Sequence, residues 1–323
     1  MAANWMRRTL VAAACASAAL LTACGSSSVE SAISPERFIV FGDGLADQGQ
    51  LGSTYSVNDG SINNWTVQLA SRYDVKIAPS SSGGTNYAYG NARISQKPDA
   101  TGNNATPTVV QQIDAFLAGG KLNNNDMVVV SAGVSDVIAN TLAFLNGAIT
   151  EEQLMKNAEQ AGADMAAQVK RLNAAGAKHI VVTGSYDLSR SPWAKAIDKE
   201  QLLSRVSIAM NSKIKIDINE MGGKQVLYVD VPYQVNLFEG DPNRYGFSNA
   251  EKPVCNSIDP GNGIGIGTNE VNSARCTTST LIDVNYNRYA FADKIYLTPR
   301  RIAVWATLRA TSSRGNGDGL IHP

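Results

Sequence analysis

Short apolar runs alternate along the chain with longer amphipathic stretches. Four of these runs are rich in β-branched residues and lack polar–apolar alternation; they cover residues 38–41, 127–131, 179–183 and 226–231. Runs of this kind are typical of parallel strands that are buried on both faces. A weaker fifth strand is expected near residues 75–77.

Between the apolar runs, apolar residues recur at the three- and four-residue spacing of amphipathic helices. These patterns cover residues 109–117, 154–172, 200–220 and 299–310. Gly176 is expected to end the second helix, and Thr298 followed by Pro299 is suited to begin the last one. Strands that alternate with helices predict an α/β domain with a parallel sheet covered by helices.

The residues before the first strand have the form of an export signal. Arg7 and Arg8 precede an apolar run over 10–21, which is shorter than the ~20 residues that span a bilayer. Leu21-Thr22-Ala23-Cys24 has the form of a lipobox. We therefore expect residues 1–23 to be a lipoprotein signal peptide and Cys24 to carry the lipid anchor. An ordinary secretory signal with an unmodified Cys24 is the alternative.

The residue after the cysteine bears on sorting. Lipoproteins retained in the bacterial inner membrane usually have Asp at this position, whereas this chain has Gly25. The resemblance to bacterial lipoproteins therefore implies an outer-membrane lipoprotein of the cell envelope. Residues 24–36 are Ser-rich and are expected to form a flexible, lipidated tether. The domain itself is expected over 37–310, and 311–323 reads as a polar tail. The membrane is thus the expected partner, through the anchor.

Charge and cysteine content narrow the picture further. The chain has 28 basic and 28 acidic residues, which become 26 against 28 without Arg7 and Arg8. This balance does not indicate nucleic-acid binding. In an exported protein Cys255 and Cys276 remain as thiols in an oxidising compartment, where a disulfide is expected and would stabilise the fold by about 3 kcal/mol. Two free thiols are the alternative.

Four short motifs lie at expected strand ends or helix starts. In chain order they are FGDGLADQG (41–49), NYAYGNA (86–92), GVSD (133–136) and DKIYLTP (293–299). Together they resemble the four conserved blocks of the GDSL/SGNH hydrolase family, over roughly residues 37–310. The resemblance implies a three-layer α/β/α sandwich of flavodoxin-like type with a parallel five-stranded sheet. It also implies hydrolysis of lipid, aryl or carbohydrate esters.

The resemblance assigns catalytic roles to positions where this chain carries other residues. Gly44 stands at the position of the nucleophilic serine, Ser135 at that of the oxyanion asparagine, and Tyr296 at that of the histidine base. Glycine has no nucleophile, and a phenol with an ordinary pKa near 10 is a poor base at neutral pH. Gly90, whose N–H belongs to the oxyanion hole, and Asp293, which would orient the histidine, remain. No catalytic set is intact, and these five residues form a vestigial site.

Other residues offer weak replacements for the lost groups. His179 opens an expected strand at the end opposite the site, and His322 lies in the tail, so both are interpreted as unrelated to catalysis. Ser135 as a substitute nucleophile would have no histidine beside it. No cluster with metal-ligand spacing is present in the sequence, and no cofactor is expected.

Several residues in and near the motifs can be explained by a structural role in place of a functional one. Asp43, Asp47 and Asp136 lie beside strand ends, where carboxylates commonly accept hydrogen bonds from exposed N–H groups. Asp293, which has no histidine to orient, could accept a hydrogen bond from the hydroxyl of Tyr296. Trp65 is interpreted as a core residue, with sugar stacking as the alternative.

Three functions remain open at the level of the sequence. One is a catalytically impaired relative that binds a lipid, glycan or ester in the vestigial cleft. The second is an esterase of low or non-standard activity. The third is a structural envelope lipoprotein whose cleft is filled.

Overall fold

The computed structural model describes residues 33–61, 64–219 and 225–299. The signal peptide, Cys24, most of the tether, the expected helix after Pro299 and the tail with His322 lie outside the described residues. Among the described residues, no helix combines the length and the apolar content needed to cross a membrane.

A parallel sheet forms the centre of the domain. Its strands are β1 (Arg37–Gly42), β2 (Asp126–Ser131), β3 (His179–Thr183) and β4 (Val226–Tyr228), in the order β1-β2-β3-β4. All six residues of β2 are buried, as expected for a central parallel strand. Ser131 pairs with Gly42 on one side and with Thr183 on the other, so the carboxyl ends of three strands meet at one edge.

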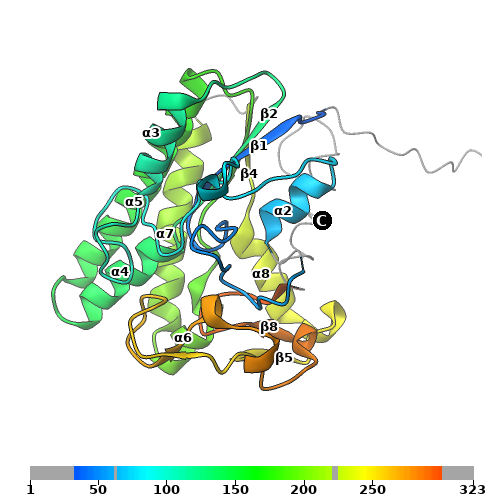
Figure 1. Ribbon diagram of the computed structural model, residues 1–323. Helices are drawn as coiled ribbons and strands as arrows, with labels where there is room; N and C mark the ends of the chain where they lie inside the picture. The colour runs from blue at the N-terminus through cyan, green and yellow to red at the C-terminus, as the bar shows by residue number, and fades with distance from the viewer. Residues whose placement is uncertain (1–32, 62–63, 220–224, 300–323) are drawn as a thin grey trace, which may run out of the picture.

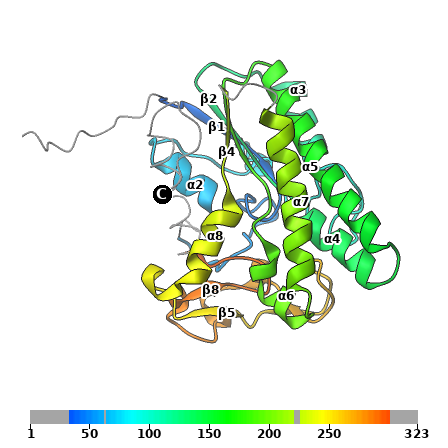
Figure 2. The ribbon, with the colours of Figure 1, turned by 180° about the vertical axis from the view of Figure 1, so that it is seen from behind.

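Helices cover both faces of this sheet and complete the three-layer α/β/α sandwich. Helices α3 (Val109–Gly119), α5 (Glu151–Ala174) and α7 (Glu200–Asn219) lie on one side, and α2 (Trp65–Ser71) lies on the other (Figures 1 and 2). The three expected helices in this part of the chain are confirmed. Trp65 is fully buried in the core, which supports its structural interpretation.

The expected fifth strand is not formed among the described residues. Residues 75–77 follow the end of α2 without strand structure. Instead, the segment around Asn86 runs along the free edge of β1, where Val40 N–H donates to the carbonyl of Thr85 and Tyr87 N–H to that of Val40. The N–H of Tyr89 also donates to the carbonyl of Gly42 at 3.2 Å, but the N–H of Gly42 donates to the side chain of Gln112 at 2.9 Å, so the pairing is incomplete.

The structure also contains elements that the apolar pattern did not predict. These are α4 (Val134–Leu145), α6 (Pro192–Ala196) and α8 (Val231–Gly240). The last of them shortens the strand expected over 226–231, since β4 ends at Tyr228. Asp230 accepts a hydrogen bond from the N–H of Tyr233 at 3.1 Å and thereby favours the start of α8.

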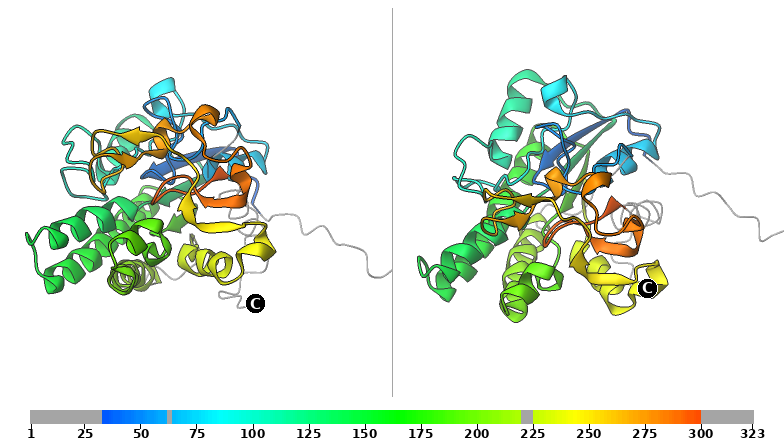
Figure 3. Two further views of the ribbon diagram at one scale, coloured as in Figure 1. Left: turned by 90° about the horizontal axis from the view of Figure 1, so that it is seen from below. Right: turned by 60° about the horizontal axis from the view of Figure 1, so that its bottom comes forward.

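The C-terminal part of the chain lies across the carboxyl edge of the sheet (Figure 3). It contains two small pairs, β5 (Asn249–Pro253) with β8 (Tyr289–Phe291) and β6 (Ile258–Asp259) with β7 (Glu270–Val271). A disulfide joins Cys255 to Cys276, as the sequence predicts. This bridge packs with Val57, Val254 and Ala292 in a small apolar cluster of its own.

Candidate functional site

Gly44 and Tyr296 come from opposite ends of the chain and meet at the carboxyl edge of the sheet. Gly44 follows β1, and Tyr296 follows β8. A Cβ atom added to Gly44 would lie 2.6 Å from Oη of Tyr296 and 2.8 Å from two of its ring carbons. The phenol therefore occupies the space that any side chain at position 44 would need.

Tyr296 is fully buried, and its hydroxyl has no hydrogen-bond partner among the described residues. Burial raises the pKa of this phenol well above 10, and the nearby carboxyl of Asp43 adds to the effect. A phenol that stays protonated at neutral pH cannot accept a proton from a nucleophile. The residue at the position that the resemblance assigns to the base is therefore a protonated phenol at neutral pH.

Both carboxylate oxygens of Asp293 accept hydrogen bonds from backbone N–H groups. One carboxylate oxygen accepts hydrogen bonds from the N–H groups of Ile295 at 2.7 Å and Tyr296 at 2.6 Å, and the other accepts from the N–H of Ser273 at 2.9 Å. Burial raises the pKa of Asp293 to about 6, although these hydrogen bonds oppose the shift. The alternative that the sequence left open, a hydrogen bond from the Tyr296 hydroxyl to Asp293, is not formed.

The N–H of Gly90 is also engaged. It donates to Oδ2 of Asp47 at 2.8 Å, while the other oxygen of Asp47 accepts from the N–H groups of Gly49 and Gln50. A Cβ atom added to Gly90 would lie 2.0 Å from the ring of Tyr55. The N–H to which the resemblance assigns an oxyanion role is therefore directed at a carboxylate.

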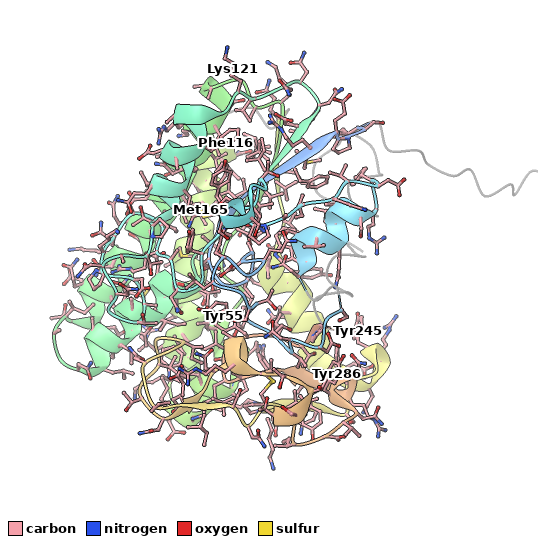
Figure 4. The ribbon with its side chains drawn as sticks, viewed as in Figure 1. Tyr55, Phe116, Lys121, Met165, Tyr245 and Tyr286 are labelled. Atoms are coloured by element: carbon pink, nitrogen blue, oxygen red, sulfur yellow. A yellow bond between two sulfur atoms is a disulfide. The ribbon has the colours of Figure 1, made fainter. Side chains whose placement is uncertain are left out.

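Tyr55 packs against both Gly90 and Tyr296 and covers the site. Its ring centroid lies 4.8 Å from that of Tyr296, and its hydroxyl accepts a hydrogen bond from Nδ2 of Asn91 at 3.0 Å. In Figure 4 Tyr55 lies between the lower end of the sheet and the C-terminal strands. The sequence did not single out Tyr55, because it lies in a polar stretch outside the four motifs and only its contacts with Gly90 and Tyr296 reveal its role.

Ser135 lies in the first turn of α4, where the preceding loop meets Asp43. Oδ2 of Asp43 accepts from the N–H groups of Gly133 and Val134 at 2.9 Å, and the N–H of Ser135 lies 3.5 Å away. Asp43 thus caps the helix, and a carboxylate is favourable there. Burial raises its pKa to about 7. The hydroxyl of Ser135 is buried and has no partner among the described residues.

Asp136 links the same helix to the loop after the second motif. Its carboxylate accepts from the N–H of Ile94 at 2.9 Å and forms an ion pair with Arg93 at 3.3 Å. Burial raises the pKa of Asp136, and the charge of Arg93 opposes this. With Asp43 and Asp47, Asp136 holds the loops at the sheet edge, in agreement with the structural alternative for all three acids.

The structure brings the vestigial residues together, and most of them are buried. Gly44, Ser135, Asp293 and Tyr296 are all buried, and Gly90 is half-buried. His179 begins β3 at the amino end of the sheet, away from this edge. The described residues contain no group of three His, Cys, Asp or Glu side chains placed to hold a metal ion.

The comparison with protein-family models agrees with the family resemblance of the motifs. Residues 38–303 match the family model described as GDSL-like Lipase/Acylhydrolase. A curated relative, the uncharacterized protein in the trpE-trpG intergenic region of Pseudomonas putida, is 25% identical over 248 residues, which are 68% of this chain and 40% of the relative. The chain thus spans about two fifths of that relative's length.

Two solved structures are similar in outline. One is a member of the lipolytic protein G-D-S-L family from Veillonella parvula DSM 2008, with 12% identity, a TM-score of 0.43, and coverage of 85% of this chain and 98% of the other. The second is LAE5, an alpha/beta hydrolase enzyme from the metagenome of Lake Arreo, Spain, with 11% identity, a TM-score of 0.42, and coverage of 88% and 98%.

Proposed function

The chain belongs to the GDSL-like lipase/acylhydrolase family, and we propose that it is a member that has lost ester hydrolysis. The observation that carries this proposal is the contact between Gly44 and Tyr296, in which a buried phenol takes the space of the nucleophile. Loss of the nucleophile or of the base in a serine hydrolase costs about 10⁶-fold in rate. Here both positions are changed at once.

A low residual activity would need the remaining oxyanion donors. One donor is worth about 10²- to 10³-fold in rate when it points at the developing oxyanion. The N–H of Gly90 points at Asp47 instead, at 2.8 Å. Ser135, at the position of the second donor, is buried. These contacts favour an inactive protein over a weak esterase.

The buried site also bears on ligand binding. The expected lipid, glycan or ester ligand would have to reach Gly44 and Ser135, but Tyr296 and Tyr55 pack over this space. We therefore favour the filled cleft, with any ligand held by the loops around it. We further propose that the domain acts in the cell envelope as an outer-membrane lipoprotein anchored through Cys24. The lipobox and the Gly25 that follows it support this.

The experiment that tests the loss of catalysis is hydrolysis of p-nitrophenyl acetate by the mature protein purified in detergent. We expect the same rate with the protein as with buffer. The matched control is Ser135→Ala, which removes the serine hydroxyl of the vestigial site. A rate well above buffer that disappears in Ser135→Ala would refute the proposal.

A further inference from the structure

A short segment after the first motif carries Tyr55 over the closed site. We call residues 53–59 the strap. Gly52 and Gly60 flank it with φ values of 96° and 82°, and a Cβ atom at either glycine would meet nothing within 4 Å. Asp59 accepts a hydrogen bond from the hydroxyl of Tyr286, and the other contacts described below also lie between the two glycines. The strap is therefore held by its middle, while its ends lie in open space.

The second half of the strap is bonded to the loop that contains Cys276. The N–H of Asn58 donates to the carbonyl of Cys276 at 2.9 Å. Nδ2 of Asn58 donates to the carbonyls of Cys276 and Ser273, both at 3.2 Å. Oδ1 of the same side chain accepts from the N–H of Thr54 at 2.9 Å, which closes the strap into a turn. Asn58 thus fastens the strap to the disulfide loop.

Val57 packs the strap against the disulfide itself. It is fully buried, and it shares a small apolar cluster with Cys255 and Cys276. Cys276 is also fully buried, and Cys255 is 3% exposed. The strap therefore helps to keep the two sulfur atoms away from solvent, and the disulfide forms part of the surface on which the strap rests.

The first half of the strap contacts the closed site. The ring centroid of Tyr55 lies 4.8 Å from that of Tyr296. The hydroxyl of Ser56 is buried and donates to the carbonyl of Leu297, the residue after Tyr296, at 2.8 Å. Two consecutive residues thus contact the site, and the next two contact the disulfide loop. Because the four residues are adjacent in the chain, a displacement of the second pair also displaces the first.

We propose that the disulfide between Cys255 and Cys276 is a redox-sensitive clasp that keeps the strap, and with it Tyr55, over the vestigial site. A dithiol opens the clasp: the S–S bond breaks, the two sulfur atoms gain two electrons and two protons, and the dithiol is oxidised to its own disulfide. The reduced loop then holds Asn58 and Val57 less firmly, so the strap opens more often. The coupling is reciprocal, because a bridge that stabilises the closed strap is protected by that strap to the same degree.

This inference rests on the filled cleft proposed above, since the strap closes that cleft. Its test follows opening of the strap and reduction of the disulfide, whereas the proposed function is tested by ester hydrolysis. An active esterase with a clasped strap would therefore refute the proposed function alone, and an inactive protein with an unclasped strap would refute this inference alone.

The first arm of the test is hydrogen exchange of the mature protein, with mass spectrometry of peptides that cover the strap and α5. Exchange times are kept short enough that α5 stays protected, so that only local opening is observed. We expect strap amides to exchange about tenfold faster in Cys255→Ser/Cys276→Ser than in the parent protein. Asn58→Ala, which keeps the disulfide, should have a similar effect on the strap.

The second arm measures how fast dithiothreitol reduces the disulfide, with N-ethylmaleimide to trap the thiols. Asn58→Ala removes the fastening of the strap, so reduction should be about tenfold faster than in the parent protein. Asn146→Ala is the matched control, because Asn146 is an exposed asparagine at the end of α4 and should leave the rate unchanged.

Four results would overturn the inference. Strap exchange could be the same with and without the disulfide, or the strap and α5 could accelerate together, which would show a general loss of stability. Reduction could be as slow in Asn58→Ala as in the parent protein, or Asn146→Ala could accelerate it equally. The Asn58→Ala results stand on their own if the double cysteine variant does not fold.

Discussion

Oη of Tyr296 lies 2.6 Å from the place where Gly44 would carry a Cβ atom, closer than real Cβ contacts come. The two residues are 252 positions apart in the chain. The two residues therefore fit each other: Tyr296 has room for its ring because residue 44 is glycine, and Gly44 leaves no void because residue 296 is tyrosine. Predictions about this site must treat the two residues as a pair.

Gly44→Ser should destabilise the protein, because the new side chain meets the fully buried ring of Tyr296. We expect a loss of about 1–3 kcal/mol in the free energy of unfolding, as for other overpacked cores. Gly44→Ser combined with Tyr296→His should lose less than the sum of the two single variants, since histidine lacks the hydroxyl. Urea unfolding measures all three, with Gly119→Ser as the control in open space. Additive losses would contradict the contact.

Buried carboxyl groups make the stability depend on pH. Burial raises the pKa of Asp43 to about 7 and those of Asp47 and Asp293 to about 6, all above the ordinary value of 3.8. The folded state therefore binds more protons than the unfolded state between about pH 4 and pH 7. The free energy of unfolding should fall as the pH rises through this window, and Asp43→Asn should flatten the upper part of the fall. A stability that rises from pH 4 to pH 7 in urea titrations would contradict this.

The disulfide between Cys255 and Cys276 should stabilise the C-terminal region. Mass spectrometry of the unreduced protein is expected to show one bridge, and a reductant should lower the free energy of unfolding by about 3 kcal/mol. The double variant Cys255→Ser/Cys276→Ser is the control, since reductant should leave its stability unchanged. Alkylation of both thiols without prior reduction would show that the bridge does not form in the cell.

Much of the fold could be predicted from the sequence because its cause is local. The β-branched runs at β1, β2 and β3 are buried on both faces, and the apolar spacing in α3 and α5 matches one covered helix face. The fifth strand failed for a reason that is not local. The segment around Asn86, and not residues 75–77, lies along the free edge of β1, and Gln112, 70 residues from Gly42, takes the N–H that would complete its pairing.

The candidate site shows the same limit. The motifs place Gly44, Gly90, Ser135, Asp293 and Tyr296 at strand ends or helix starts, and their role as a vestigial site stays a prediction. They do not predict that the site is closed, because closure depends on Tyr55, which touches Gly90 and Tyr296 only in the folded chain. Nor do they show that Asp47 takes the N–H of Gly90, since a carboxylate next to a turn has many potential donors.

The proposed anchor is tested by Cys24→Ala. Without the thiol, the lipid cannot be attached, and we expect an uncleaved precursor that no longer fractionates with the outer membrane. Metabolic labelling with a fatty acid and membrane fractionation measure the two effects. Gly25→Asp is a matched variant that keeps the lipid and should move the protein to the inner membrane. A mature, membrane-bound Cys24→Ala protein would refute the assignment.

The last prediction concerns how far the vestigial site can be restored. Gly44→Ser alone should hydrolyse no p-nitrophenyl acetate, because a serine without a base is a weak nucleophile and also meets the ring of Tyr296. Gly44→Ser with Tyr296→His supplies nucleophile and base and removes the clash, so hydrolysis should first become measurable in this double variant. Adding Ser135→Asn should raise the rate by a further ~10²-fold through a side-chain oxyanion donor. Ser135→Asn in the parent background should do nothing, since one donor without a nucleophile has no intermediate to stabilise.

Rates that appear only in this order would show that the loops around Asp43, Gly90 and Asp293 still hold the geometry of an enzyme. A triple variant that folds like the parent and remains inactive would instead place the loss in the closure by Tyr55 and in the bond from Gly90 to Asp47, which these three substitutions leave in place.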